Sequence, residues 1–283
     1  MPMITPEDRA FFHENGYLRV KNLVPKPMCD AVIEAIFAFL GMDKNDPADW
    51  YRLPLTPGGM IEMYHHQAMW DIRQYPPLYQ MFMELLEDEK LWVTLDRVNM
   101  KPPQHPDHPE YDHKGFIHWD ADTRNLDRPL RVQGVLYLAD TDENTGGFQC
   151  VPGFHNDLPE WIKTQPADRN PHAPDMNDLP PGRKLTPIPG KAGDFVIWNT
   201  FLAHGNGHNT SKNPRLAQFV SMYPANAMGD NANREERIEA WRNREPIKAP
   251  YFFGDPRRIE QETFPVPALT PLGKKLLGLE DWE

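Results

Sequence analysis

A histidine and an aspartate stand two positions apart in the stretch GFIHWDADTR, residues 115–124. If this stretch is a strand, His118 and Asp120 lie on the same face, about 6.5–7 Å apart, because strand side chains alternate. If it is a helix, the two groups diverge by roughly 200° and cannot share an ion. The spacing therefore raises the hypothesis of a metal site at a strand end.

A candidate third ligand, His204, ends the apolar run FVIWNTFLAH, 84 positions after Asp120. In a rolled antiparallel sheet distant strands face each other, so this histidine can meet the His-x-Asp pair. Two imidazoles and one carboxylate that leave other positions open are typical of non-haem Fe(II) oxygenases. Catalytic zinc also takes three protein ligands, so the ligands alone do not choose the metal.

An arginine favours iron over zinc. Arg215 follows the polar turn GNGHNTSKNP, 11 positions after His204, which places it at the start of the next strand. A guanidinium there is suited to bidentate capture of a carboxylate. A 2-oxo dicarboxylate would chelate iron with its 2-oxo acid end and place its far carboxylate on Arg215. A zinc hydrolase needs no such arginine.

These motifs resemble those of the phytanoyl-CoA dioxygenase family. The similar stretches span nearly the whole chain: FFHENGYLRVKNLV, HWD (118–120), GGFQCVPGFH (146–155), HGNGHNTS (204–211), NPR (213–215) and PLGKKLLGL. The resemblance implies an Fe(II)- and 2-oxoglutarate-dependent dioxygenase on a double-stranded β-helix, which is a jelly-roll barrel. It implies that O2 is consumed, that an unactivated C–H bond of a small organic substrate is hydroxylated or otherwise oxidised, and that succinate and CO2 are released.

The resemblance also assigns site residues. It assigns iron binding to three of them: His118, Asp120 and His204. Arg215 matches the anchor of 2-oxoglutarate. Asn206 departs from the family, which commonly has serine there, but can still donate a hydrogen bond to the cosubstrate. Gln133, on the strand after the iron motif, resembles a position that contacts the cosubstrate in relatives. Related iron halogenases replace the carboxylate so that chloride can bind, and Asp120 leaves no such vacancy.

Composition excludes several classes of protein. The 283 residues are 40% hydrophobic, enough for a sizeable core, and the net charge of −11 argues against nucleic-acid and anionic-membrane partners. Two cysteines do not make a disulfide framework. The stretch MPMITPEDRAFF lacks the regions of a signal peptide, and no apolar run is long enough to span a bilayer. We expect a soluble cytoplasmic protein, and no oligomeric state is predicted.

The elements expected around the site are mainly β, with flanking helices. Helices are predicted over 5–16, 27–41, roughly 77–88 and 233–244. Strands are predicted over 17–20, 91–100, 131–140 and 215–224, with a short strand and a turn over 148–153 and a turn followed by a strand over 193–205. Several strands with long loops, and no regular strand–helix alternation, predict a double-sheet, cupin-like barrel or jelly roll.

The chain is expected to form one dioxygenase domain over residues 1–283. Its parts are an N-terminal helical support with a substrate loop (1–90), a jelly-roll core (91–224) and a C-terminal helix and tail (225–283). Inside the core, the Pro/Asn/Asp-rich segment 156–184 is a candidate lid, because loops that long are often functional. The remaining histidines are expected to have structural or lid roles: His65, His66, His105, His108, His113, His155, His172 and His208.

Two alternatives come from other classes: a metal-dependent hydrolase or isomerase on a cupin-like barrel, and a non-catalytic relative that binds a small molecule. Arg215 argues against the first and the complete ligand set against the second. An acyl-CoA substrate would need a basic groove for its phosphates, and the sequence has no dense basic cluster. We therefore expect a small substrate that is polar or resembles a secondary metabolite. Residues in the segments 50–73 and 102–113 are expected to determine which substrate binds.

Overall fold

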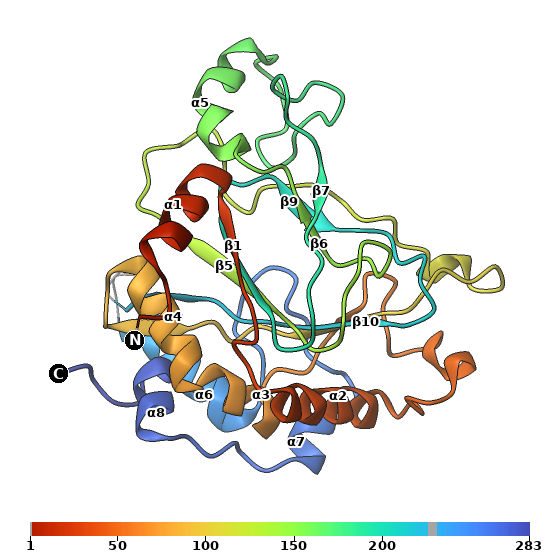
Figure 1. Ribbon diagram of the computed structural model, residues 1–283. Helices are drawn as coiled ribbons and strands as arrows, with labels where there is room; N and C mark the ends of the chain where they lie inside the picture. Colours follow the sequence, from red (N-terminus) through yellow and green to blue (C-terminus); the bar gives the residue numbers. More distant parts are fainter. Residues whose placement is uncertain (1, 226–230) are drawn as a thin grey trace.

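The computed structural model describes residues 2–225 and 231–283, and most of its strands form two layers (Figure 1). The larger sheet has the order β1-β8-β5-β10-β4-β2 with antiparallel neighbours, and the smaller sheet has the order β7-β6-β9. The larger sheet contains β1 (Tyr17–Val20), β2 (Met60–Ile61), β4 (Val98–Lys101), β5 (Val132–Tyr137), β8 (Phe195–Asn199) and β10 (Arg215–Phe219). The others are β3 (Leu91–Val93), β6 (Phe148–Cys150), β7 (Thr186–Pro187), β9 (His204–Asn206) and β11 (Met222–Pro224), with β11 paired to β3.

A hydrophobic cluster joins the facing sides of the two sheets. Val135, Tyr137 and Trp198 from the larger sheet pack with Phe148 and Cys150 from the smaller one. This is the expected jelly roll of strands with flanking helices. The expectation of a barrel needs one correction, because hydrogen bonds do not close the two sheets into a barrel within residues 2–225 and 231–283. Edge strands β2 and β7 have only two residues each, which is too short to complete a closed wall.

Helices cover the outer side of the larger sheet. Figure 1 shows α2, α3, α4, α6 and α8 grouped on the side away from β6, β7 and β9. The apolar side chains of these helices share one cluster with outward residues of the sheet such as Leu136, Ile197 and Leu216. In the described residues the helices are α1 (Pro6–Asn15), α2 (Lys26–Leu40), α3 (Gln67–Arg73), α4 (Pro76–Leu86), α5 (Phe154–Thr164), α6 (Asn231–Asn243), α7 (Ile259–Thr263) and α8 (Pro271–Leu277). Short 3-10 turns lie at Pro47–Trp50 and Pro109–Tyr111.

Helix α1 begins and ends where its capping residues predict. Thr5 and Asp8 form a reciprocal capping box, and Pro6 occupies the first turn. Gly16 closes the helix with φ 78°, a left-handed conformation that glycine adopts without steric cost. A side chain there would also meet the ring of His155 at 2.6 Å. The predicted first helix is therefore confirmed.

Three predicted strands are divided between sheets, since the stretch 193–205 also separates into β8 of the larger sheet and β9 of the smaller one. The prediction of one strand over 91–100 was wrong, because β3 pairs with β11 whereas β4 belongs to the larger sheet. Between them the carbonyl of Asp96 accepts a 2.5 Å hydrogen bond from buried Arg73, which fixes a bend. The predicted strand over 215–224 likewise divides into β10 and β11. Alternation continued through both bends, so the sequence pattern did not reveal them.

The candidate lid segment contains helix α5, which the sequence analysis missed. Phe154, Leu158 and Trp161 recur at helical spacing and are buried, although Pro159 lies within the helix. Helix α5 and the loop after it pack against Trp119, between His118 and Asp120. The segment thus supports the His-x-Asp stretch from behind, and a lid function stays a prediction. No helix among the described residues is long and apolar enough to cross a membrane.

Candidate metal centre

The two candidate histidine ligands are brought together by their own backbones. The N–H of His118 donates to the carbonyl of His204 at 2.9 Å, and the N–H of His204 donates back at 3.0 Å. This antiparallel bridge attaches the His-x-Asp stretch to β9. The imidazole centroids are consequently only 4.6 Å apart.

Asp120 completes a compact group with both imidazoles. Its Oδ2 lies 3.1 Å from Nε2 of His204, and its Oδ1 lies 3.6 Å from Nε2 of His118. One ligand atom from each of the three residues lies within 4.8 Å of the others, and this is the one such group found in the described residues. Ligands bonded to one ion at about 2.0–2.2 Å have similar mutual separations. The three side chains are thus arranged to bind a single metal ion.

Carbonyl groups orient both imidazoles. Nδ1 of His204 lies 2.8 Å from the carbonyl oxygen of Leu202, and Nδ1 of His118 lies 3.3 Å from that of Phe116. A carbonyl accepts only from a protonated ring nitrogen, so each Nδ1 carries the hydrogen. In the neutral form of each ring, the lone pair of Nε2 is left facing Asp120. Metal-binding histidines are commonly held in this way.

Asp120 is held as an anion. Burial opposes its ionisation, but when His118 and His204 are protonated their Nε2–H groups donate to Asp120, and these hydrogen bonds outweigh burial and hold the pKa of Asp120 well below its usual range. Burial lowers the pKa of His118, but the hydrogen bond to Asp120 outweighs this and raises it. A carboxylate that stays ionised at neutral pH is ready to bind a cation.

The interior of the larger sheet carries a buried positive charge beside this group. Arg215 is 1% exposed, and its Nη1 donates to Oδ1 of Asn99 at 2.8 Å. Its Nε and Nη2 have no hydrogen-bond partner among the described residues. Lys101 pairs with Arg215 in the β4–β10 register, so the two side chains share a face. Nζ of Lys101 donates to the carbonyl of Gly207 at 2.5 Å.

Burial perturbs both cations, and the charge of Arg215 also acts on Lys101. Burial lowers the pKa of Lys101 to about 8, and the charge of Arg215 contributes to this shift. Burial also lowers the pKa of Arg215 to about 10. Neither side chain forms an ion pair with a carboxylate in the described residues, and the charge of Asp112 only partly opposes the lowering of the pKa of Lys101.

The two predicted cosubstrate contacts, Gln133 and Asn206, lie on strands that line the same interior. Gln133 stands opposite Trp198 in the β5–β8 register, and its buried Oε1 has no partner in the described residues. The buried Nε1 of Trp198 is likewise without a partner there. Asn206 follows His204 by two positions on β9, so both point to one face.

The other histidines serve the fold, and none belongs to a second cluster of metal ligands in the described residues. Buried His65 accepts from the indole N–H of Trp70 and contacts the carbonyl of Glu245. The remaining ones cap a helix, contact aromatic or acidic neighbours, bond to a backbone carbonyl, or lie exposed in a loop: His66, His105, His108, His113, His155, His172 and His208.

Sequence reasoning missed Lys101 and Asn99. Both lie on the strand VNMK, and their inward direction follows from pairing with β10, more than a hundred positions away. The one available signal was a lysine at the end of an otherwise apolar strand. Lysine is almost never fully buried without a partner, but the sequence does not show that this strand is buried.

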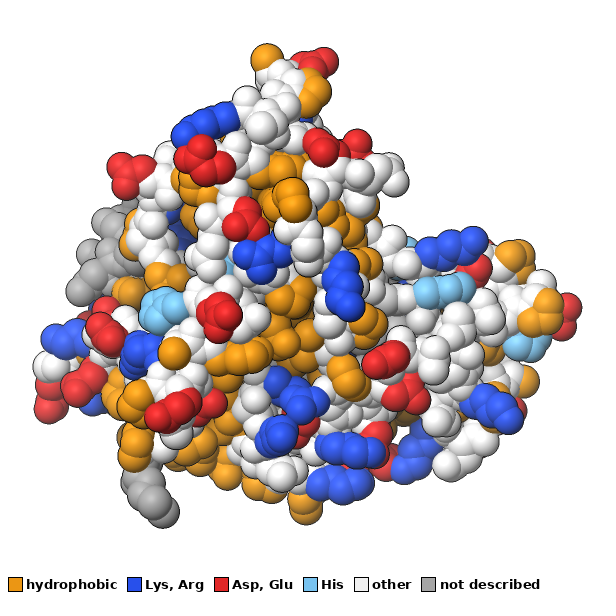
Figure 2. Space-filling view, turned by 45° about the horizontal axis from the view of Figure 1, so that its top comes forward, with side chains coloured by type: hydrophobic (Ala, Val, Ile, Leu, Met, Phe, Trp, Pro, Cys, Tyr) orange, Lys and Arg blue, Asp and Glu red, His pale blue; other side chains and the backbone are white. Residues whose placement is uncertain are grey.

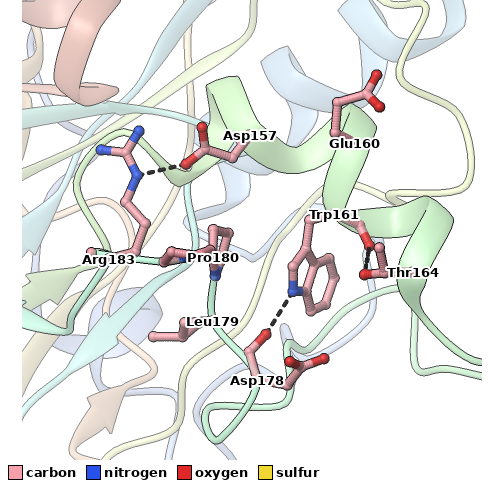
Figure 3. A pocket seen from close by; sticks show the side chains of 10 residues that line it. Asp157, Glu160, Trp161, Thr164, Asp178, Leu179, Pro180 and Arg183 are labelled. Carbon is pink, nitrogen blue, oxygen red and sulfur yellow. Dashed lines mark hydrogen bonds and ion pairs between the residues drawn. The ribbon is translucent and has the colours of Figure 1, made fainter.

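A cavity of about 520 Å³ lies elsewhere, between α5 and the loop 178–183 (Figure 3). Its walls are tied by their own contacts, since Arg183 pairs with Asp157 at 2.6 Å and Nε1 of Trp161 donates to the carbonyl of Asp178 at 2.6 Å. It shares no lining residue with the His–Asp–His group. Basic and acidic side chains are interspersed on the face shown in Figure 2.

The fold and the site define a jelly-roll protein with a candidate mononuclear metal centre. The model of the family "Phytanoyl-CoA dioxygenase (PhyH)" matches residues 12–217, so the chain belongs to this family. The family expected from the sequence motifs is confirmed.

Several known proteins are similar to this chain. A Dictyostelium discoideum protein named as a phytanoyl-CoA dioxygenase is 25% identical over 264 residues, covering 77% of this chain and 75% of the relative. The ectoine dioxygenase of Bordetella bronchiseptica is 24% identical over 228 residues, covering 74% and 72%. GlcNAc Inducible Gene 2 from Candida albicans has a TM-score of 0.74 at 13% identity, covering 100% of this chain and 78% of that chain. The epimerase SnoN, crystallised with Fe3+, α-ketoglutarate and nogalamycin RO, has a TM-score of 0.56 at 16% identity, covering 94% and 96%.

Proposed function

We propose that this chain is an Fe(II)- and 2-oxoglutarate-dependent dioxygenase that oxidises a C–H bond of a small organic substrate. The observation that carries the proposal is the convergence of His118, Asp120 and His204 beside the unpaired guanidinium of Arg215. Family membership supports the reaction class. The iron and 2-oxo acid in the SnoN structure support the choice of cofactors.

The three side chains fit iron. Two neutral imidazoles and one carboxylate suit Fe(II), and a mononuclear group of three ligands leaves positions open for a cosubstrate and O2. Bound there, iron with 2-oxoglutarate and O2 supplies oxidative decarboxylation to succinate and CO2, coupled to oxidation of the substrate. Asp120 retains the carboxylate whose loss would make room for a halide, which favours oxygen insertion or another oxidation over halogenation.

The interior fits 2-oxoglutarate. Arg215 and Lys101 together place two buried positive charges on one wall with no carboxylate bonded to either. Burying charges without a counter-charge is costly, and the far carboxylate of the cosubstrate would offset this cost. A carboxylate would also accept from the free Nε and Nη2 of Arg215 in the bidentate geometry that guanidinium favours.

The other polar groups of the interior would orient the cosubstrate. The N–H of Trp198 and the amides of Gln133 and Asn206 can hydrogen-bond to its oxygens. Carbonyl groups meanwhile keep both histidine rings fixed, and the packing of Trp119 against α5 holds the segment between the ligands. The chain thus provides binding and orientation for the cofactors that carry the chemistry.

The proposal is tested by measuring succinate formation from 2-oxoglutarate with Fe(II) and O2 supplied. We expect His118→Ala to lose metal binding and turnover, because it removes one of three ligands. His172→Ala is the matched control, since that side chain is exposed and forms no part of the group. Full turnover in His118→Ala would overturn the assignment of the ligands.

The alternatives predict different results in the same preparation. Preference for zinc with no affinity for 2-oxoglutarate would favour a hydrolase or isomerase. Weak iron binding with no succinate, in protein that is folded, would favour a non-catalytic binding protein. The visible charge-transfer absorption of an Fe(II)–2-oxo acid chelate, measured without O2, reports cofactor binding independently of turnover.

A further inference from the structure

A second, mainly apolar cavity opens directly at the candidate metal centre. Its volume is about 410 Å³, which falls in the usual range for small-molecule sites, about 300–1,000 Å³. Asp120 and Gln133 both line it, so it reaches one of the three candidate metal ligands and a predicted cosubstrate contact. A molecule in this cavity would therefore lie against Asp120, next to the proposed site of substrate oxidation.

Most of the cavity wall offers no hydrogen bond to a ligand. Apolar contact comes from Leu86, Ala121, Pro129, Leu130, Val132, Phe201, Met222, Tyr223 and Pro224. Two inner hydroxyl oxygens each accept a backbone hydrogen bond, since Oγ1 of Thr94 accepts from the N–H of Ser221 and Oγ of Ser221 accepts from the N–H of Gly134. Asp96 accepts from the N–H of Arg97 at 2.7 Å. The cavity thus suits a carbon skeleton better than a strongly polar molecule.

Two arginines line this cavity without partners. Arg128 and Arg131 are exposed, and their side chains make no hydrogen bond or ion pair within the part of the chain that the structure describes. Arg124, in the same segment, is instead held by Asp122 at 2.5 Å and does not line the cavity. The positive charge on the cavity is therefore free for a ligand, unlike that of its neighbour.

We propose that the substrate is an amphiphilic anion, whose apolar skeleton fills this cavity while a carboxylate or phosphate group contacts Arg128 and Arg131. The inference rests on the proposed function, since it takes the metal centre to be where substrate is oxidised. It narrows the substrate class expected from the sequence, because the cavity selects an apolar body and one anionic end. Leu130, 38% exposed between the two arginines, marks the change from apolar wall to charged rim.

The test compares ligands that differ only in the head group. The protein is first saturated with Fe(II) and 2-oxoglutarate under anaerobic conditions, so that the interior cations are occupied. Decanoate, decyl phosphate, decan-1-ol and decyltrimethylammonium are then titrated calorimetrically below their aggregation concentrations. We expect both anions to bind about tenfold more tightly than decan-1-ol, and the cation to bind most weakly. The carboxylate and phosphate arms show which anionic group the rim prefers.

Variants locate the binding. Each of Arg128→Ala and Arg131→Ala should weaken decanoate binding about threefold, the scale of an exposed ion pair, and the double variant about tenfold. Lysine at both positions should retain most of the affinity, and Arg124→Ala should leave it unchanged. Leu130→Asp should weaken decanoate, decyl phosphate and decan-1-ol, because it adds a negative charge and removes apolar contact. Decan-1-ol binding as tightly as decanoate, or full affinity in the double alanine variant, would overturn the inference.

The two proposals fail in different ways. If 2-oxoglutarate binds to the Fe(II)-loaded protein and no decyl anion does, the substrate inference fails and the proposed function stands. If 2-oxoglutarate does not bind, the proposed function fails. The Arg128 and Arg131 variants can then still be compared in metal-free Arg215→Met protein, where the interior arginine cannot capture the probe.

Discussion

Arg237 and Arg215 are both about 1% exposed, but their hydrogen-bond donors are used very differently. Arg237, on α6, donates from Nε, Nη1 and Nη2 to four oxygens at 2.7–3.1 Å, those of Val93, Tyr223, Leu276 and Leu277. Its guanidinium also lies 5.2 Å from the ring of Trp92. It joins α6, α8 and β3, and the fold itself satisfies it.

Arg215 makes one hydrogen bond, to Asn99, and two of its nitrogens have no partner in the described residues. Its neighbour across the sheet is another cation, Lys101, rather than a carboxylate. All three side-chain nitrogens of Arg237 have acceptors in the protein. Two side-chain nitrogens of Arg215, in the interior that also holds the candidate metal centre, have none in the described residues. Under the proposed function, Arg237 stabilises the protein and Arg215 binds a ligand, and the predictions below test this difference.

The largest effect is expected from removing the satisfied arginine. Arg237→Met should lower the free energy of unfolding by about 3–5 kcal/mol, because it leaves buried carbonyl groups without donors. The affinity of the remaining folded protein for 2-oxoglutarate should be unchanged. Chemical denaturation and a 2-oxoglutarate titration measure the two quantities. Wild-type stability in Arg237→Met would contradict the stabilising role of Arg237.

Removing Arg215, which has two nitrogens without acceptors, should weaken ligand binding without lowering stability. Arg215→Met should weaken 2-oxoglutarate binding at least about 100-fold, equivalent to about 2.7 kcal/mol, because a bidentate charged contact is lost. The free energy of unfolding without ligand should not fall, since a buried charge with two unpartnered nitrogens is removed. A loss of stability as large as that of Arg237→Met would show that Arg215 is structural.

The sequence distinguished these two arginines only in part. Arg215 could be predicted as a ligand contact because its position after a His-x-Asp and a distal histidine is itself a pattern. His118 and Asp120 could be predicted because strand alternation is a local property. For Arg237 the sequence predicted only a helix over 233–244, because the burial of this side chain depends on how α6 packs against α8 and β3.

Other features depended on long-range pairing that no local pattern shows. The inward direction of Lys101 follows from its register with Arg215, 114 positions later in the chain. The bend between β3 and β4 depends on Arg73, which reaches the carbonyl of Asp96 from α3. Helix α5 was missed for a local reason, since Pro159 within it favoured a loop.

Replacing Lys101 tests the cost of a buried charge through the pH dependence of stability. Its pKa in the folded protein is about 8, below the ordinary lysine value of 10.5, so the unfolded chain binds more protons between these values. Stability therefore rises with pH across this interval. Lys101→Met should unfold less readily than the wild type below pH 8 by a few kcal/mol, as one pKa unit corresponds to about 1.4 kcal/mol. The advantage should shrink as the pH approaches 10.5.

The same variant should bind 2-oxoglutarate about tenfold more weakly at neutral pH, because one of two interior cations is lost. Denaturant melts from pH 7 to 10 and anaerobic titrations at pH 7 measure the two effects. The Lys101→Arg variant is the control, since it keeps the charge across this range. A stability difference that does not vary with pH would show that the gain comes from packing rather than from relief of a buried charge.

The smallest effect is expected at two tryptophans. Their indole N–H groups are neutral donors, and one has an acceptor whereas the other has none in the described residues. Nε1 of Trp161 donates to the carbonyl of Asp178 at 2.6 Å, whereas the buried Nε1 of Trp198 has no partner in the described residues. Phenylalanine at either position removes the donor and some apolar area. Trp161→Phe should cost about 1 kcal/mol more stability than Trp198→Phe, because only Trp161 loses a hydrogen bond.

Trp198→Phe alone should weaken 2-oxoglutarate binding, by about three- to tenfold, if its N–H donates to the cosubstrate. Equal stability losses with unchanged binding would show that an unpartnered donor in this interior does not indicate a ligand contact, and Arg215 would then have to be argued from its charge alone.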